Sequence, residues 1–117
     1  MAAAAAAALE RVTTCDAGFW IHFDVDVLDP SLVPAVDSPL PGGLDLSQAA
    51  ELLAVLAQHP AALGLQVSIY DPALDPGRLA APKIVRTLEQ AFAAWSDSAT
   101  DNTNMSKLAD VESGTVW

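Results

Sequence analysis

Two runs of apolar residues along the chain predict buried β-strands. The first, Gly18–Asp26, is rich in aromatic and β-branched residues and becomes polar towards its end. The second, Gly64–Tyr70, has a similar character and leads into a polar loop. Buried strands that deliver polar groups at their carboxyl ends are typical of parallel sheets. We therefore expect two parallel strands.

Helical spacing of apolar residues follows each predicted strand. The first helix is expected from Asp45 or Ser47, the candidate caps, to about His59, because Pro60 ends the pattern. A second helix is expected over residues 79–95. The order strand, loop, helix, strand, loop, helix indicates an α/β fold.

The loops carry the residues that break regular structure. Residues 28–43 are rich in Pro and Gly, which excludes a helix or a central strand. Asp71 and Asp75 each precede a proline, which predicts turns. Two strands do not make a stable open sheet, so we expect the chain to belong to a larger α/β domain or to need a partner.

The 117 residues divide into three segments by composition. Residues 1–16 are Ala-rich and predict a short helix running into Glu10 and Arg11. Residues 17–95 hold the α/β pattern. Residues 96–117 are polar without periodicity, so we expect disorder there.

Charge and cysteine content exclude several classes of function. The formal net charge of −10 argues against binding nucleic acid or an anionic membrane. The single cysteine, Cys15, cannot form an intramolecular disulfide or a cysteine-based zinc site by itself. The Ala-rich start is too short to span a bilayer and lacks a basic region before it. We expect a soluble, cytoplasmic protein.

Asp24 and Asp26 are the leading candidates for chemistry. On a strand, residues two apart leave the same face, and His22 lies on that face one step earlier. Two adjacent carboxylates repel each other unless a cation lies between them, and a hard divalent cation does this best. The alternative is a capping or turn role at the strand end.

Several metal motifs contain such a triplet. A calcium EF-hand needs Gly where this chain has Asp29, and it follows a helix rather than a strand. Haloacid-dehalogenase-type phosphatases place the triplet after an apolar strand, and Ser68 and Lys83 imitate their later motifs, but no second acidic pair is evident. Nucleotide-sugar transferases use the triplet with manganese but need a nucleotide-binding half.

The residues after the triplet distinguish these possibilities. Residues Phe23–Gly43 closely resemble the third metal-binding signature of the ureohydrolase family, which contains arginases and agmatinases. The triplet, Pro30, Pro34 with Ala35, and the later glycine all match. The match continues over residues 19–92. The resemblance implies the carboxyl-terminal portion of a three-layer, parallel-sheet, arginase-like fold.

The resemblance also implies a binuclear manganese hydrolase that cleaves a C–N bond in guanidino or amidino compounds. Asp24 matches the carboxylate that bridges the two metal ions, and Asp26 matches a ligand of the second ion. Two cations sharing a water lower its pKa and orient the hydroxide. The family's earlier ligands, a His and an Asp-Ala-His-x-Asp run, have no counterpart here. We expect the chain to be inactive alone and to require a complementing amino-terminal chain, or to form a homo-oligomer.

Two positions depart from the family pattern. Ile69 stands where a Glu normally binds the substrate's guanidinium, so the substrate is expected to differ. His22 replaces a small hydroxyl residue; it is interpreted as a packed or hydrogen-bonded residue at the strand end, or as a partner of Asp24.

Three further side chains are candidates for roles beside the metal ligands or on the substrate side. Asp29 is expected to fix the turn beneath the metal strand, and Ser38 lies within the matched signature. Asp71 lies where substrate would approach, and it is expected on the same side of an extended chain as Ile69. The alternative function is a non-catalytic, truncated remnant that acts as a binding or assembly module.

Overall fold

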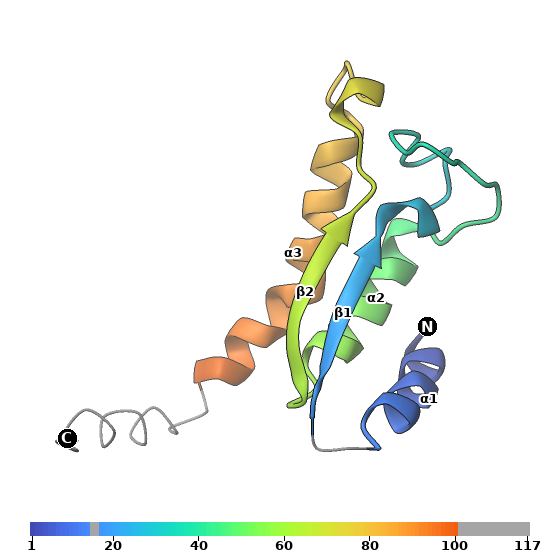
Figure 1. The fold of residues 1–117 in the computed structure, drawn as a ribbon. Helices are drawn as coiled ribbons and strands as arrows, with labels where there is room; N and C mark the ends of the chain where they lie inside the picture. Colours follow the sequence, from blue (N-terminus) through green and yellow to red (C-terminus); the bar gives the residue numbers. More distant parts are fainter. Residues whose placement is uncertain (15–16, 101–117) are drawn as a thin grey trace, which may run out of the picture.

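The computed structural model describes residues 1–14 and 17–100 (Figure 1). In chain order the elements are α1 (Ala2–Val12), β1 (Phe19–Asp24), the 3-10 turn η1 (Val25–Val27), α2 (Leu46–Ala57), β2 (Ala62–Ser68), the 3-10 turn η2 (Pro72–Leu74) and α3 (Ala80–Thr100). The predicted α/β class and the order of strands and helices are confirmed. Among these residues, no helix is long and apolar enough to cross a membrane.

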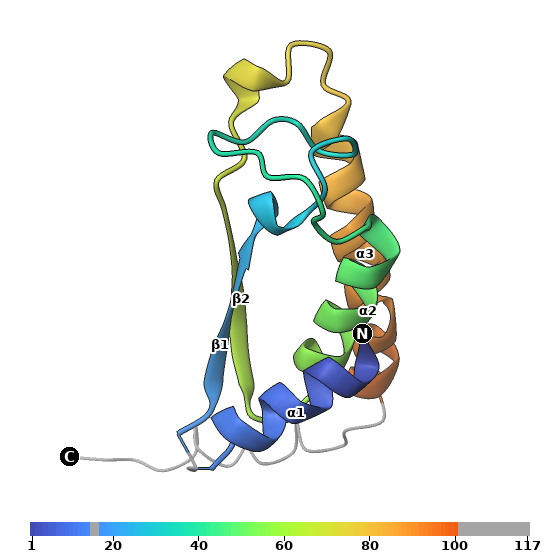
Figure 2. The ribbon, with the colours of Figure 1, turned by 90° about the vertical axis from the view of Figure 1, so that its right-hand side faces the viewer.

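The two strands form a parallel sheet, as predicted. Trp20 pairs with Gly64, and the register continues to Asp24, which pairs with Ser68. Turning the molecule shows α2 and α3 together on one face of the sheet (Figure 2). The described helices leave the opposite face uncovered, so residues 1–14 and 17–100 form two layers of the expected three-layer fold.

The core lies between the sheet and these two helices. Ile21 and Phe23 point from β1 into it, while Trp20 and His22, which alternate with them, are exposed. The helices contribute further buried residues to the same cluster, among them Ala49, Leu53, Ala57, Ile84 and Ala91. This alternation confirms that one face of β1 packs on helices.

Both strands end earlier than the apolar runs predicted. β1 stops at Asp24, and Asp26 lies in η1, so the argument from strand alternation does not apply to Asp26. β2 spans residues 62–68 because Ile69 has φ +72°, a left-handed conformation that ends the extended chain.

The boundaries of α2 agree with the prediction, whereas α3 ends later than predicted. Asp45, not Ser47, caps α2, in a capping box with Gln48. α3 extends to Thr100, five residues beyond the expected end. Most of the segment expected to be disordered, residues 101–117, lies outside the described residues, as does Cys15.

Asp75 joins the β2–α3 loop to the start of α3. It is a buried carboxylate, only 7% exposed. It accepts hydrogen bonds from the N–H groups of Leu79, Ala80 and Ala81 and from the Tyr70 hydroxyl. The sequence predicted a turn here, and the side chain additionally satisfies the first amides of the helix.

Candidate metal centre at the end of strand β1

Two half-buried carboxylates follow one another at the carboxyl end of β1. Asp24 is the last residue of the strand, and Asp26 follows in η1. The Asp26 N–H donates to Asp24 Oδ1 over 3.5 Å, so Asp24 also caps the turn. The capping role and the metal role that the sequence left open are therefore compatible in this geometry.

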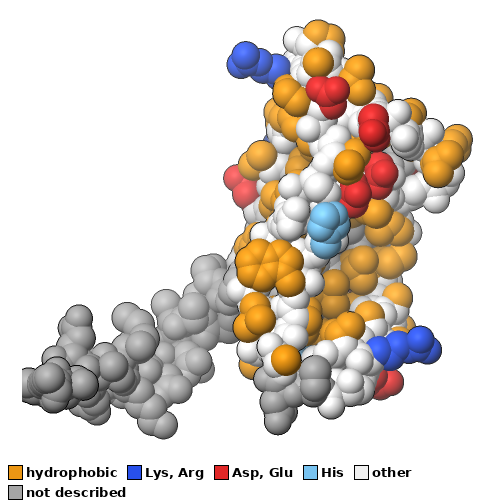
Figure 3. All heavy atoms as spheres, in the orientation of Figure 1, with side chains coloured by type: hydrophobic (Ala, Val, Ile, Leu, Met, Phe, Trp, Pro, Cys, Tyr) orange, Lys and Arg blue, Asp and Glu red, His pale blue; other side chains and the backbone are white. Residues whose placement is uncertain are grey.

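The electrostatics at this end of the strand favour a cation. Burial raises the pKa of Asp26, and charge repulsion from the neighbouring Asp24 raises it further. The charge of Asp37 acts in the same direction. Acidic side chains gather at this end of the molecule in the surface view (Figure 3). A bound divalent cation would relieve the repulsion among them.

His22 lies on the uncovered face of the sheet. Its Nε2 is 2.9 Å from the hydroxyl of Ser68, the last residue of β2. The imidazole is therefore held across the two strands, one step before Asp24. This placement matches the hydrogen-bonded interpretation of His22.

Asp29 holds the loop of residues 28–43 in shape. Its Oδ1 accepts from the N–H and the hydroxyl of Ser31, at 2.9 and 2.6 Å, and its Oδ2 accepts from the Gly42 N–H at 3.0 Å. These donors lower the pKa of Asp29, the Ser31 hydroxyl most of all. Asp29 thus acts through the loop rather than as a free ligand. Ser38 lies exposed in the same loop.

The β2–α3 loop reaches the same end of the sheet. The Asp71 N–H donates to the Ala35 carbonyl at 3.0 Å, and its carboxylate accepts from the Ala73 N–H at 2.8 Å. Ile69 is 41% exposed. Because Ile69 adopts a left-handed conformation, the chain from Ile69 to Asp71 is not extended, and the expectation that both side chains share one side by strand alternation is wrong.

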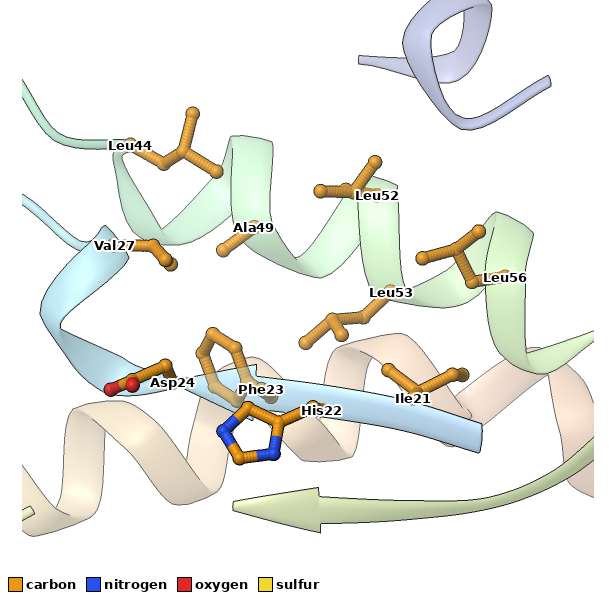
Figure 4. A pocket seen from close by; sticks show the side chains of 10 residues that line it. All are labelled: Ile21, His22, Phe23, Asp24, Val27, Leu44, Ala49, Leu52, Leu53 and Leu56. Carbon is orange, nitrogen blue, oxygen red and sulfur yellow. The ribbon is translucent and has the colours of Figure 1, made fainter. Parts of the chain in front are cut away.

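An open apolar groove runs beside the carboxylates, between β1 and α2. It has a volume of about 170 Å³, and His22 and Asp24 stand at its polar border (Figure 4). Its apolar walls are formed by Ile21, Phe23, Val27, Leu44, Ala49, Leu52, Leu53 and Leu56. The hydrophobic pattern does not reveal this groove, because helical spacing marks Leu52 and Leu56 as apolar without showing that they flank an open surface.

The described residues do not bring together a complete set of metal ligands. Across residues 1–14 and 17–100, no group of three or more His, Cys, Asp or Glu side chains is placed to hold a metal ion. Carboxylate oxygens suit hard divalent cations such as manganese, so the residues present fit one side of such a site.

Comparison with known proteins shows which family this chain resembles. The model of the arginase family matches residues 1–92. The N(1)-aminopropylagmatine ureohydrolase of Thermus thermophilus is 44% identical over 53 residues, which cover 45% of this chain and 18% of that protein. The arginase of Brucella melitensis is 38% identical over 74 residues, covering 62% of this chain and 24% of that protein.

A solved structure agrees at the level of the fold. The arginase of Entamoeba histolytica, crystallised with L-ornithine, superposes with a TM-score of 0.69 at 16% identity, covering 76% of this chain and 30% of that one. The chain therefore spans less than a third of the length of these relatives. With the family model matching most of its residues, the chain belongs to the arginase family.

Proposed function

We propose that this chain forms part of a binuclear manganese hydrolase that cleaves C–N bonds in guanidino or amidino compounds. The observation that carries the proposal is the pair Asp24 and Asp26, adjacent at the carboxyl end of a parallel strand in a chain of the arginase family. In this proposal the carboxylates of Asp24 and Asp26 would hold the metal ions, with Asp24 shared between them as the family resemblance implies.

The metal ions, when bound, supply a water molecule whose pKa is low enough to yield a nucleophilic hydroxide near neutral pH. The chain's own residues would hold the metal ions and position the groups beside them. Asp24 and Asp26 present carboxylate oxygens at the end of a strand whose inner face packs against the helices. Ser68 fixes one nitrogen of His22, which leaves the imidazole beside Asp24 as a positioning group.

The proposal includes a requirement for further polypeptide. Two carboxylates cannot hold two divalent ions tightly, and the described residues offer no third ligand. We infer that the chain by itself is inactive. A second candidate, a non-catalytic binding or assembly module, is favoured by the same incomplete ligand set and by the open groove beside it.

The substrate is proposed to be less cationic than a guanidinium at the end that faces Ile69, or to be held by other residues. An isoleucine cannot pair a buried cation, and an unpaired buried charge costs several kcal/mol. Asp71 uses only Oδ1 to accept the Ala73 N–H, and the left-handed Ile69 removes the strand alternation that would have placed Asp71 on the Ile69 side.

Isothermal titration calorimetry with manganese tests the half-site in the chain as it exists. We expect weak binding that Asp24→Ala abolishes, whereas Glu89→Ala, which removes an exposed carboxylate from α3, leaves it unchanged. Circular dichroism establishes that each variant remains folded. Binding that survives the double substitution Asp24→Ala, Asp26→Ala would overturn the assignment of these ligands.

A further inference from the structure

Lys83 connects helix α3 to the loop of residues 28–43. Its ammonium group donates a hydrogen bond of 2.7 Å to the carbonyl oxygen of Leu32, which lies 51 residues away along the chain. The lysine is half-buried, whereas most lysines keep the ammonium group in water. Holding so long a side chain in one geometry costs rotamer entropy, so a fixed lysine needs a strong contact such as a charge-assisted hydrogen bond.

The loop and α3 also share a packed core at this contact. Val33 and Ala35 of the loop are fully buried, and they belong to the same apolar cluster as Ala80 and Ile84 of α3. Lys83 directly precedes Ile84 in the first residues of the helix. The lysine hydrogen bond therefore adds a polar connection to a contact that packing already brings together, and the position of α3 bears directly on the position of the loop.

Backbone hydrogen bonds lead from this connection to the carboxylates at the end of β1. The Leu32 N–H donates to the Asp29 carbonyl at 2.9 Å. The Asp29 N–H donates in turn to the Leu44 carbonyl, and the Leu44 N–H donates to the Val27 carbonyl. Val27 is the last residue of η1, the turn that contains Asp26. A shift of the loop at Leu32 would therefore act on the turn that carries one of the two carboxylates.

Arg86, one turn further along α3, makes no such contact. Lys83 and Arg86 line the same open pocket, together with Leu46 and Pro82. Arg86 is exposed, and within residues 1–14 and 17–100 its guanidinium has no hydrogen-bond or ion-pair partner. A general electrostatic effect on the acidic end of the molecule would be shared by both cations, whereas an effect that acts through the loop belongs to Lys83 alone.

We propose that Lys83 is a positioning residue for the metal centre at the end of β1. By holding the Leu32 carbonyl, it fixes the loop that follows the carboxylates and, through the backbone hydrogen bonds of that loop, the turn that carries Asp26. This role rests on the proposed function, because Asp24 and Asp26 must bind the ion whose affinity Lys83 controls. Lys83 acts through the backbone of the loop and not on the ion itself.

Lys83→Met, Lys83→Arg and Arg86→Met form a matched set of variants in the full chain. Methionine keeps an unbranched apolar side chain but cannot donate a hydrogen bond, whereas arginine keeps both the charge and the donors. Lys83→Met and Arg86→Met each remove one positive charge, which by Coulomb attraction alone should slightly strengthen the binding of a cation. Isothermal titration calorimetry measures the manganese affinity of each variant, and circular dichroism establishes that each one is folded.

Amide hydrogen exchange without metal is a second measurement, because it reports local opening of the loop independently of any ion. The N–H groups of Asp29 and Leu44 are the reporters. We expect Lys83→Met to lower their protection, and Lys83→Arg and Arg86→Met to leave it unchanged.

In the calorimeter we expect Lys83→Met to bind manganese roughly tenfold more weakly, at the lower end of the effect of groups that orient metal ligands. Lys83→Arg should retain the affinity, and Arg86→Met should bind as tightly as the unsubstituted chain or more tightly. A lower melting temperature for Lys83→Met with unchanged manganese affinity would show a merely structural role and overturn the inference, as would equal weakening by Arg86→Met.

Absence of manganese binding by the unsubstituted chain would count against the proposed function. Hydrogen exchange would then decide the link between Lys83 and the turn by itself. Protection lost at Asp29 and Leu44 only in Lys83→Met would support the link, and equal protection in Lys83→Met and Arg86→Met would overturn it.

Discussion

Replacing Gly43 with alanine should damage the loop that holds the end of β1. A Cβ at this position would lie 2.5 Å from the carbonyl carbon of Leu28, 2.6 Å from the Asp29 nitrogen and 2.7 Å from the Val27 oxygen. All three are backbone atoms, so no flexible side chain can yield. The two segments would have to separate by about half an ångström even to reach the shortest distances that such atoms tolerate.

The separation would act on hydrogen bonds that lie next to the carboxylate pair. The Leu44 N–H donates to the Val27 carbonyl at 2.8 Å, and the Asp29 N–H donates to the Leu44 carbonyl at 2.9 Å. Overpacking of this kind costs about 1–3 kcal/mol in free energy of unfolding. At a urea dependence of about 2 kcal/mol per molar, the midpoint of unfolding should fall by roughly 0.5–1.5 M.

Gly77→Ala is the matched control. A Cβ there would meet only the Leu79 side chain, at 3.4 Å, and Gly77 is not among the residues with positive φ. This variant should be neutral or slightly more stable, because alanine reduces the conformational freedom of the unfolded chain. Urea unfolding followed by circular dichroism compares the two, and equal midpoints for Gly43→Ala and Gly77→Ala would refute the close approach of residues 28 and 43.

Three other predictions concern activity and pH. The purified chain should release no urea from arginine or agmatine with manganese present, and appreciable turnover in a colorimetric assay would show that the ligand set is complete. A full-length homologue carrying the Ser-Ile-Tyr-Asp-Pro segment should hydrolyse arginine and agmatine poorly, and Ile69→Glu should raise kcat/KM; efficient hydrolysis that Asp71→Asn leaves unchanged would contradict this. Burial acts to raise the pKa of Asp75, but the amides of Ala81, Ala80 and Leu79 and the Tyr70 hydroxyl outweigh it and lower the pKa. The resulting stabilisation is present above the unfolded pKa of about 3.9 and is lost as pH falls through the folded value, so Asp75→Asn should lower Tm at pH 7 and do so much less at pH 2.

The hydrophobic pattern predicted β1 and α2 because each of them buries one face, whereas β2, also predicted to be buried, contains no fully buried residue. The aromatic and β-branched run around Ile21 and Phe23 marks a strand by its composition, and Asp45 or Ser47 ahead of the apolar helical spacing marks a helix start. The family signature located the carboxylate pair, since so long a spaced pattern is specific even where a lone triplet is not.

Features that depend on the three-dimensional arrangement could not be predicted in the same way. Apolar residues continue past Asp24, so nothing in the pattern shows that the Asp24 side chain caps a turn there. Ile69 gives no local sign of a left-handed conformation, which β-branched residues seldom adopt. The role of Asp75 depends on amides four to six residues later, and the groove exists only once α2 packs against β1.

Manganese titration followed by amide NMR tests the central claim most directly, because it locates the ion on the chain itself. The paramagnetic ion broadens the resonances of nearby amides. We predict that substoichiometric manganese first broadens the amides of residues 24–27 and of Ser68, and that Asp24→Ala removes this selectivity. Uniform broadening, or broadening that begins at exposed carboxylates such as Glu51 and Glu89 while residues 24–27 stay sharp, would contradict the proposed metal centre.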